Sequence, residues 1–414
     1  MPPPGAVSSR PLPGRPENGV EMTDGIPSRR LRILSLCNCP LDPALGSGYV
    51  SLRYAEGLRA AGHTVDQLGP PDYELFHGRL RGRALSYRQA LGMAAVALRR
   101  VRTTPYDLVE LTGAQGWLAM HLLTRMPGRT FRVVQRSNGL EPHLEEAMQA
   151  AARAGLVPEK RWFHLSPSRL FTAALRRADG LVTVSTFDRD WALTHGCGSA
   201  DRILALPNGL PDSYLGQDVP EERPPVVGYC GSWLPVKGTD LLVRALPPFL
   251  REHPTWRAAL IGVGDTFQAG DHFPEDVLPR IEVIPRADRE GRLREIYRGL
   301  AVALLPSVYE SFGLAAAEAM ACGAALVAVP AGYAAGLRHR EEAFLLGERS
   351  PQALGQALRE LAADPVLRHT LARGGRDKVQ ELRWDRVIRA LDAAYTTWAS
   401  REVAVSLRVT GERP

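Results

Sequence analysis

A lysine in a glycine-bounded turn is the first residue whose type and position suggest chemistry. The chain reads Gly231-Ser-Trp-Leu-Pro-Val-Lys237-Gly238 directly after a short apolar run. Glycines allow a tight turn and a close approach to a ligand, and a lysine ammonium is a point charge that suits a phosphate. A helix expected from Thr239 would add the positive end of its dipole. The alternative interpretation is a strand that ends at a glycine, followed by a solvated lysine.

Two glutamates eight positions apart form the second candidate group. Residues 306–323 read PSVYESFGLAAAEAMACG. Glu310 is expected in the loop after a strand, and Gly313 and Leu314 open a helix whose first amides are free to bind an anion. Glu318 falls inside that helix among alanines, where an unpaired carboxylate is costly. Its two oxygens suit vicinal hydroxyls such as those of a ribose, and the alternative is a salt-bridged core glutamate.

Strands and helices must position these residues, and the apolar runs of the chain predict them. Short continuous apolar runs alternate with helical segments, which indicates parallel sheets with helices on both faces. The pattern restarts after a Pro- and charge-rich linker at 218–225. The expected strands are 31–37, 63–69, 107–112, 131–137, 180–185 and 202–207 before the linker, and 226–232, 257–264, 280–285, 302–307 and 324–330 after it.

The predicted fold class is therefore α/β, with two doubly wound, Rossmann-like domains that face each other across a cleft. Residues 1–30 are expected to form a disordered leader, because they are rich in Pro, Gly and Ser and contain no signal-peptide core. The two domains are expected over 31–217 and 226–383, and a final amphipathic helix over 384–400 is expected to cross back to the first domain. Ligands of such sheets bind at the carboxyl ends of the strands, where strand order reverses.

Composition excludes several classes of protein. The 45% apolar and 23% charged residues are typical of a globular protein. The net charge of +6, whose excess lies before residue 221, is too small to indicate a nucleic-acid binder. The five cysteines are sparse and show no zinc-site spacing, so we expect no metal and a reducing, cytoplasmic compartment. Asp188 and Asp190 resemble a metal-binding Asp-x-Asp, but they follow Ser185 at a strand-to-helix junction and are interpreted as first-turn acids behind a cap.

An arginine-rich segment at 79–102 has two interpretations. It holds seven arginines and no acid around a short apolar centre. Such a segment is compatible with binding to an anionic membrane surface or to a phosphorylated acceptor. The alternative is an exposed helix with a solvated basic face.

The two motifs together resemble a known family. Gly-x6-Lys-Gly, followed about 70 residues later by the Glu-x7-Glu segment, is similar to the retaining GT-B-fold glycosyltransferases of the large group-four family. Pro207-Asn208-Gly209 before the linker and IGVGD at 261–265 support this resemblance, which covers residues 31–400. It implies that the first domain faces the acceptor and that the second binds a nucleotide-diphosphate sugar.

The resemblance also implies a role for each matching residue. Lys237 would bind the donor diphosphate, Glu310 the donor sugar and Glu318 the nucleotide ribose, with Lys237 and Glu310 as the catalytic pair. The remaining donor-binding positions that it implies are Gly46 and Gly48 over the diphosphate, Asn138 at the sugar, Gly231 and Ser232 in the lysine turn, Arg286 at the base, and Ser311, Phe312, Gly313 and Leu314 at the second motif.

Three departures from the family pattern concern charge and proton transfer. Ser232 occupies a position where the family often has arginine, so one cation on the diphosphate is missing. The strand at 107–112 contains Glu110 and Thr112 where a histidine is common. The next strand leads into Asn138-Gly139-Leu140-Glu141 rather than His-Gly, and an asparagine can hydrogen-bond a sugar but cannot carry a proton.

The activity that the resemblance implies is transfer of a sugar from a nucleotide-diphosphate sugar to an acceptor hydroxyl, with retention and without metal or cofactor. Lys237 and helix amides would stabilise the leaving diphosphate, whose oxygen would accept the acceptor's proton. The acceptor is open, with lipid-linked and phosphorylated compounds as candidates. The expected location is cytoplasmic, with a peripheral membrane contact through 79–102. Two alternatives stay open: a catalytically weakened module that only binds nucleotide sugars, and a GT-B-fold sugar epimerase.

Overall fold

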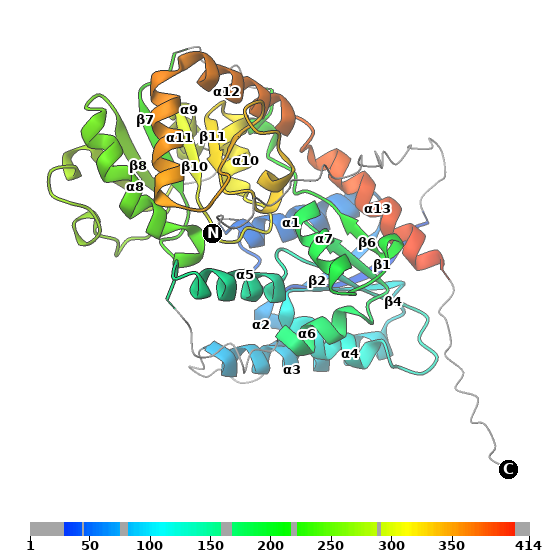
Figure 1. The fold of residues 1–414 in the computed structure, drawn as a ribbon. Helices are drawn as coiled ribbons and strands as arrows, with labels where there is room; N and C mark the ends of the chain where they lie inside the picture. Colours follow the sequence, from blue (N-terminus) through cyan, green and yellow to red (C-terminus); the bar gives the residue numbers. More distant parts are fainter. Residues whose placement is uncertain are drawn as a thin grey trace, which may run out of the picture.

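The computed structural model describes residues 29–43, 45–74, 82–158, 168–216, 222–287 and 291–401. Most of the predicted leader and half of the predicted linker lie outside these residues, as do the first three residues of the arginine-rich segment. Within the described residues the chain forms two six-stranded sheets, and every pair of neighbouring strands is parallel. The predicted α/β class with two doubly wound sheets is confirmed (Figure 1).

The first sheet has the strand order β2-β1-β3-β4-β5-β6. Its strands are β1 Arg32–Leu36, β2 Thr64–Leu68, β3 Leu108–Thr112, β4 Arg132–Arg136, β5 Gly180–Thr183 and β6 Ile203–Ala205. Its helices are α1 Gly46–Ala60, α2 Pro70–Tyr73, α3 Gly82–Thr103, α4 Trp117–Leu123, α5 Glu141–Arg153, α6 Ser168–Leu175 and α7 Thr186–Thr194. Every residue of β3 and β4 is buried, because apolar clusters cover both faces; Leu108 and Val109 lie in different clusters.

The second sheet has the strand order β12-β11-β10-β7-β8-β9. Its strands are β7 Val226–Cys230, β8 Arg257–Ile261, β9 Ile281–Ile284, β10 Val302–Leu305, β11 Ala325–Ala328 and β12 Phe344–Leu345. Its helices are α8 Thr239–Glu252, α9 Arg292–Arg298, α10 Leu314–Ala321, α11 Pro351–Ala363 and α12 Pro365–Val379. Val302 and Ala303 of β10 again belong to clusters on opposite faces.

Strand order reverses once in each sheet, next to β1 and β3 in the first and next to β7 and β10 in the second. At such a point the connection after one strand runs to one side of the sheet and the connection after its neighbour runs to the other side. The loops that follow the two strands therefore separate and open a crevice. The lysine turn follows β7 and the segment with Glu310 follows β10. The two sequence motifs are therefore neighbours at the crevice of the second sheet.

The last helix, α13 Trp384–Ser400, packs on the first sheet although it follows the second in sequence (Figure 1). Trp384, Leu391 and Tyr395 join the cluster that contains Ile33 and Tyr54. The Trp384 ring meets the Tyr54 ring edge-on, with 5.2 Å between the centroids.

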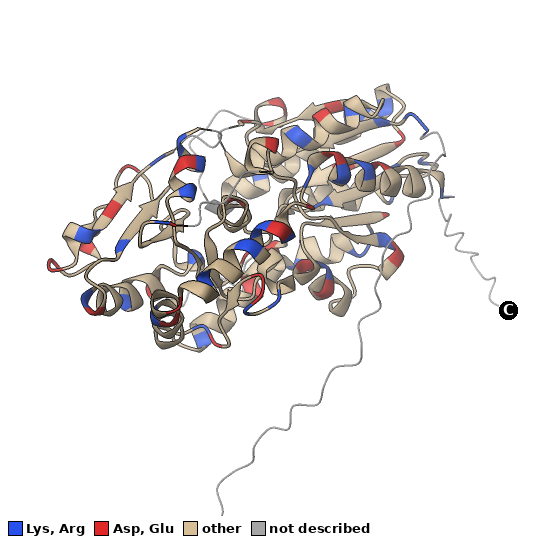
Figure 2. Cartoon of the chain, turned by 90° about the horizontal axis from the view of Figure 1, so that it is seen from above, with Lys and Arg blue, Asp and Glu red and all other residues tan. Residues whose placement is uncertain are grey.

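The apolar centre of the arginine-rich segment is part of the protein core. Ala90, Met93 and Ala97 of α3 are fully buried. Met93 and Ala97 belong to the cluster that also contains Met120 of α4. Leu91 is 56% exposed. The apolar face that the membrane interpretation needs is thus already packed against the sheet, which favours the solvated basic face. In Figure 2 basic residues (blue) and acidic residues (red) are interspersed along the ribbon. None of the helices in the described part is long and apolar enough to span a bilayer.

Candidate active site

Loops from both sheets line one cavity of about 350 Å³. It lies where the two crevices face each other, because its residues follow β1, β3 and β4 of the first sheet and β7 and β10 of the second. The lining residues are Asn38, Cys39, Ser47, Gly113, Asn138, Gly139, Leu140, Glu141, Leu144, Val236, Lys237, Tyr309, Glu310 and Ser311. Four residues predicted from the sequence are among them, namely Asn138, Lys237, Glu310 and Ser311.

An ion pair joins the two motifs on the wall of the second domain. The Nζ atom of Lys237 lies 2.7 Å from Oε1 of Glu310, and the Ser307 hydroxyl donates to the same oxygen at 2.9 Å. Gly238 makes this approach possible: its φ is +80°, and a Cβ there would lie 2.1 Å from the Pro306 carbonyl oxygen. The glycine predicted to permit a close approach thus places the lysine turn against the loop that carries Glu310.

The helix starts expected near this pair are present. Gly238, which precedes α8, and Gly313, which precedes α10, both adopt left-handed conformations with φ of +80° and +89°. Neither cap has a side chain, so the first backbone amides of each helix are not capped by the residue before them. Two helix N-termini therefore point their positive ends toward the loops with Lys237 and Glu310.

Other predicted donor residues lie outside the cavity lining. Glu318 is 2% exposed and its Oε2 accepts a hydrogen bond from Tyr297 at 3.4 Å. Phe312 belongs to the core cluster and packs on Tyr333. Arg286 follows β9 near the sheet edge, is 80% exposed, and pairs with Asp265 at 2.7 Å.

The remaining predicted positions lie at strand ends and helix starts. Gly46 begins α1, and a Cβ on Gly48 would meet the Asp42 carbonyl oxygen at 2.4 Å. Gly231 and Ser232 follow β7, where the Tyr229 hydroxyl donates to the Ser232 carbonyl at 2.8 Å. Ser47, between the two glycines of α1, is the residue of that turn that reaches the cavity.

A buried chain of polar groups holds Asn138 on the wall of the first domain. Arg136 is 1% exposed and donates from Nη1 to the Asn138 Oδ1 at 3.2 Å. Its Nε lies 3.2 Å from Glu110, which also accepts from Ser35 at 2.8 Å and from the Tyr395 hydroxyl of α13. Burial opposes the charge on Arg136 most strongly, but the Glu110 carboxylate together with Cys37, Tyr395 and Tyr54 outweighs it, and the pKa of Arg136 is raised. Glu110 thus keeps a cation behind Asn138.

Tyr309 connects the two domains across the cavity. Its hydroxyl accepts from the Leu140 N–H at 2.9 Å and donates to the Asp188 carboxylate at 3.0 Å. His143 contacts the same carboxylate at 2.8 Å, and the Ser311 hydroxyl donates to the Asn138 carbonyl at 2.6 Å. Burial and the Asp188 charge raise the pKa of Tyr309 well above its usual range.

Asp188 therefore has a larger role than the one predicted for it. Ser185 does cap α7, because its hydroxyl accepts from the Asp188 N–H at 3.3 Å. The Asp188 side chain is fully buried and binds His143 and Tyr309, while Asp190 is exposed beside Arg189. Among the residues that the structure describes, no three His, Cys, Asp or Glu side chains gather in a metal-binding arrangement.

Glu141 is a site residue to which the sequence analysis gave no role. It is the first residue of α5 and lines the cavity, with Oε1 accepting from the Ala114 N–H at 2.9 Å. Its Oε2 is buried without a hydrogen-bond partner. Burial raises the pKa of Glu141 to about 7. Its place at the carboxyl end of β4, three residues after Asn138, was the available signal.

Two family models match the chain, one for each sheet. The model described as "Glycosyl transferase 4-like domain" matches residues 46–209, and the model described as "Glycosyl transferases group 1" matches residues 224–364. Together they cover most of the chain, in the order that the sequence resemblance implied.

Relatives and solved structures agree with these matches. The chain is 29% identical to a D-inositol 3-phosphate glycosyltransferase of Acidothermus cellulolyticus over 64% of its own length and 63% of the relative's, so the match spans less than two thirds of that relative. A protein of the same name from Actinosynnema mirum is 28% identical over 70% of this chain and 72% of its own. Sucrose-phosphate synthase from Thermosynechococcus elongatus superposes with a TM-score of 0.70 at 21% identity, covering 89% of this chain and 99% of that one. Anabaena HepE in complex with UDP and glucose superposes with a TM-score of 0.62 at 17% identity, covering 89% of this chain and 100% of that one. Both solved structures show that the fold is shared.

Proposed function

Because the chain belongs to the group-four glycosyltransferase family, we propose that it transfers a glycosyl group from a nucleotide-diphosphate sugar to an acceptor hydroxyl. The observation that carries this proposal is the Lys237–Glu310 pair of 2.7 Å between two uncapped helix starts, in a cavity shared by both domains. A cation beside helix N-termini stabilises a diphosphate, whose negative charge grows as the glycosidic bond breaks.

In this mechanism Lys237 binds the departing diphosphate and Glu310 binds the sugar. Within the described residues Lys237 and Ser307 both donate to Oε1 of Glu310, so Oε2 remains for a sugar hydroxyl. The Lys237 ammonium then lies between the sugar-binding carboxylate and the diphosphate, where it offsets the charge that develops. No arginine follows Gly231, so we assign the rest of this task to the amides at the starts of α8 and α10.

We further propose that the anomeric configuration is retained, with no metal in the reaction. A diphosphate oxygen on the departing face accepts the acceptor's proton, so both bonds change on one face of the sugar. The support is the family resemblance and the presence of Lys237 where a cation is needed. Glu318 and Arg286 are proposed to hold the ribose and the base.

The acceptor is proposed to present hydroxyl groups to Asn138 and Glu141. On the wall of the first domain the described lining residues include no lysine or arginine, and the Arg136 charge behind Asn138 is paired with Glu110. The relatives are named for D-inositol 3-phosphate, and a phosphate would need a cation on this wall. The described wall thus favours a neutral polyol or sugar over its phosphate ester.

The proposal is tested by incubating the protein with UDP-, GDP- and ADP-sugars, with and without polyol and polyol-phosphate acceptors. We expect a glycoside whose anomeric configuration by NMR matches that of the donor. A donor converted to its epimer without acceptor would indicate an epimerase. Tight donor binding without any product would indicate a binding module.

A further inference from the structure

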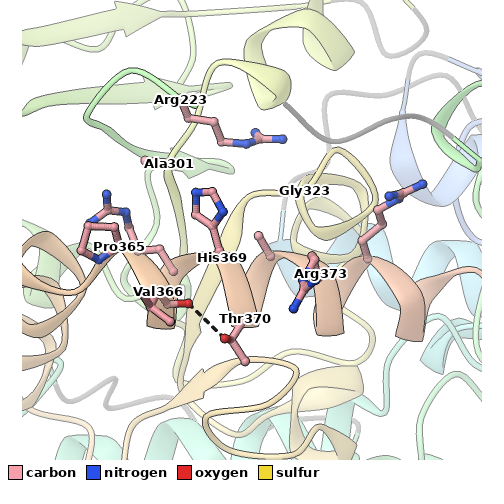
Figure 3. A pocket seen from close by; sticks show the side chains of 11 residues that line it. Arg223, Ala301, Gly323, Pro365, Val366, His369, Thr370 and Arg373 are labelled. Carbon is pink, nitrogen blue, oxygen red and sulfur yellow. Dashed lines mark hydrogen bonds between the residues drawn. The ribbon is translucent and has the colours of Figure 1, made fainter. Parts of the chain in front are cut away.

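A second cavity, of about 550 Å³, lies beside helix α12 in the second domain (Figure 3). Arg223, Ala301 and Gly323 precede β7, β10 and β11, so the cavity is at the amino ends of these strands. Helix α12 forms its other side. The lining residues are Arg223, Ala301, Gly323, Pro365, Val366, Arg368, His369, Thr370, Ala372, Arg373 and Arg376.

The charge of this cavity is of one sign. Four arginines and a histidine line it, and none of its described lining residues is an aspartate or a glutamate. His369, Arg373 and Arg376 are spaced so that they share one face of α12, and Figure 3 shows Arg223 across the cavity from His369. Within the described ranges, no carboxylate lies within 4 Å of the Arg373, Arg376 or His369 side chains.

Two of these arginines also have unused donors. The Nε atoms of Arg223 and Arg376 are buried and have no hydrogen-bond partner. Arg223 is fixed in place, because it donates to the carbonyls of Arg298 at 2.9 Å and Leu300 at 3.0 Å. Burial lowers the pKa of Arg223 to about 10, so it is still charged at neutral pH. Arg223 and Arg368 donate to backbone carbonyls, which do not neutralise their charge. Holding several guanidinium charges together costs free energy unless an anion offsets them.

We propose that this cavity binds a small organic phosphate. Guanidinium groups match phosphate oxygens with paired hydrogen bonds, and the volume is that of a cavity for a small metabolite. The fixed Arg223 on one side and α12 on the other would hold the phosphate between them. This site is separate from the active-site cavity, with which it shares no lining residue.

The test measures binding of glycerol 3-phosphate and pyrophosphate by calorimetry, in a Lys237→Ala background that removes the proposed donor contact. We expect Arg373→Ala/Arg376→Ala to weaken binding at least tenfold. The control, Arg359→Ala/Arg389→Ala, removes two arginines that pair with Glu252 and Asp385 away from the cavity and should change binding less than twofold. Equal affinity in the two double variants would overturn the proposal.

Thermal unfolding provides a readout independent of calorimetry and checks that the variants fold. In phosphate-free buffer Arg373→Ala/Arg376→Ala should unfold at the wild-type temperature or above it, because repulsion is removed. Adding glycerol 3-phosphate should raise the unfolding temperature of the wild type but not of this variant. Binding to vesicles that contain phosphatidic acid, without binding of the soluble phosphates, would assign the cavity to a lipid and overturn the proposal.

Discussion

The Tyr309 hydroxyl donates to the buried Asp188 carboxylate at 3.0 Å and so links the loop after β10 to helix α7 of the other domain. The same hydroxyl accepts from the Leu140 N–H, two residues beyond Asn138. One phenol thus satisfies a carboxylate and a backbone amide on the wall of the first domain, while the next residue is Glu310, which we propose binds the donor sugar. The position of the loop after β10 is therefore tied to the position of the loop after β4.

Replacing Tyr309 with phenylalanine should destabilise the domain contact. The change leaves the Asp188 carboxylate with one partner fewer and the Leu140 N–H without its acceptor, which costs about 1–3 kcal/mol. Urea unfolding should show a lower midpoint, and the KM for donor and acceptor should rise together. The control is Tyr87→Phe, because that residue is 39% exposed on α3. Equal midpoints for the two variants would contradict the role of Tyr309.

Lys237→Ala should lower kcat by about two to three orders of magnitude, as loss of one oxyanion-stabilising group does. Lys378→Ala is a matched control: both lysines pair with a glutamate, at 2.7 and 2.8 Å, and both are about one-third exposed, but Lys378 lies on α12. Steady-state kinetics with a saturating acceptor measures the effect. If kcat of the Lys237 variant lay within threefold of kcat of the Lys378 variant, Lys237 would have no role in the reaction.

The two glutamates of the second motif should separate binding from turnover. Glu318→Gln should weaken binding of the free nucleoside diphosphate, because the proposed ribose contact is lost, whereas Glu310→Gln should mainly lower kcat, because that side chain faces the sugar. Calorimetry with the diphosphate alone isolates the first effect. Both variants keep a hydrogen-bonding group of similar size, which limits damage to the Tyr297 and Ser307 contacts. Equal losses of diphosphate affinity would contradict this division.

The sequence predicted the sheets well because parallel strands buried on both faces are continuous apolar runs, as in β3 and β4. The two-residue strand β12 was missed, since Phe344 and Leu345 are too short a run to be recognised. Lys237 and Glu310, which line the cavity, were singled out because local glycines and strand ends mark them. The roles of Asp188 and Tyr309 depend on contacts 121 residues apart, which no local pattern contains.

The environment of the arginine-rich segment also depends on contacts that the sequence does not show. Its charge pattern is visible in the sequence, but whether Met93 faces lipid or protein is decided by α4 and the sheet, which pack against it. The cationic cavity was not predicted either, because Arg223 and Arg376 are far apart in the chain and meet only in the fold.

Glu141 gives the last prediction, which concerns pH. Its pKa is about 7 in the folded protein, above the ordinary 4.5 expected in the unfolded chain. Below pH 4.5 both states hold the proton, so Glu141 does not affect the pH dependence. Between pH 4.5 and 7 the unfolded chain loses the proton first, so stability falls as pH rises, and above pH 7 the full cost remains. Glu141→Gln stays neutral, so its free energy of unfolding should exceed that of the wild type by up to about 3 kcal/mol at pH 8 and by little at pH 4.

Unfolding midpoints in urea at pH 4, 6 and 8 test this, with Glu145→Gln on the same helix as the control. Glutamine keeps an oxygen for the Ala114 N–H and places an amide where Oε2 is now unpartnered. If Glu141 contacts the acceptor as proposed, the same variant should be more stable and yet lose kcat/KM at pH 8, since a stabilising change at a functional carboxylate removes the charge that the reaction uses. If the stability difference between Glu141→Gln and the wild type were the same at all three pH values, burial would not be holding this carboxyl protonated. The physical reason for placing Glu141 in the reaction would then be lost.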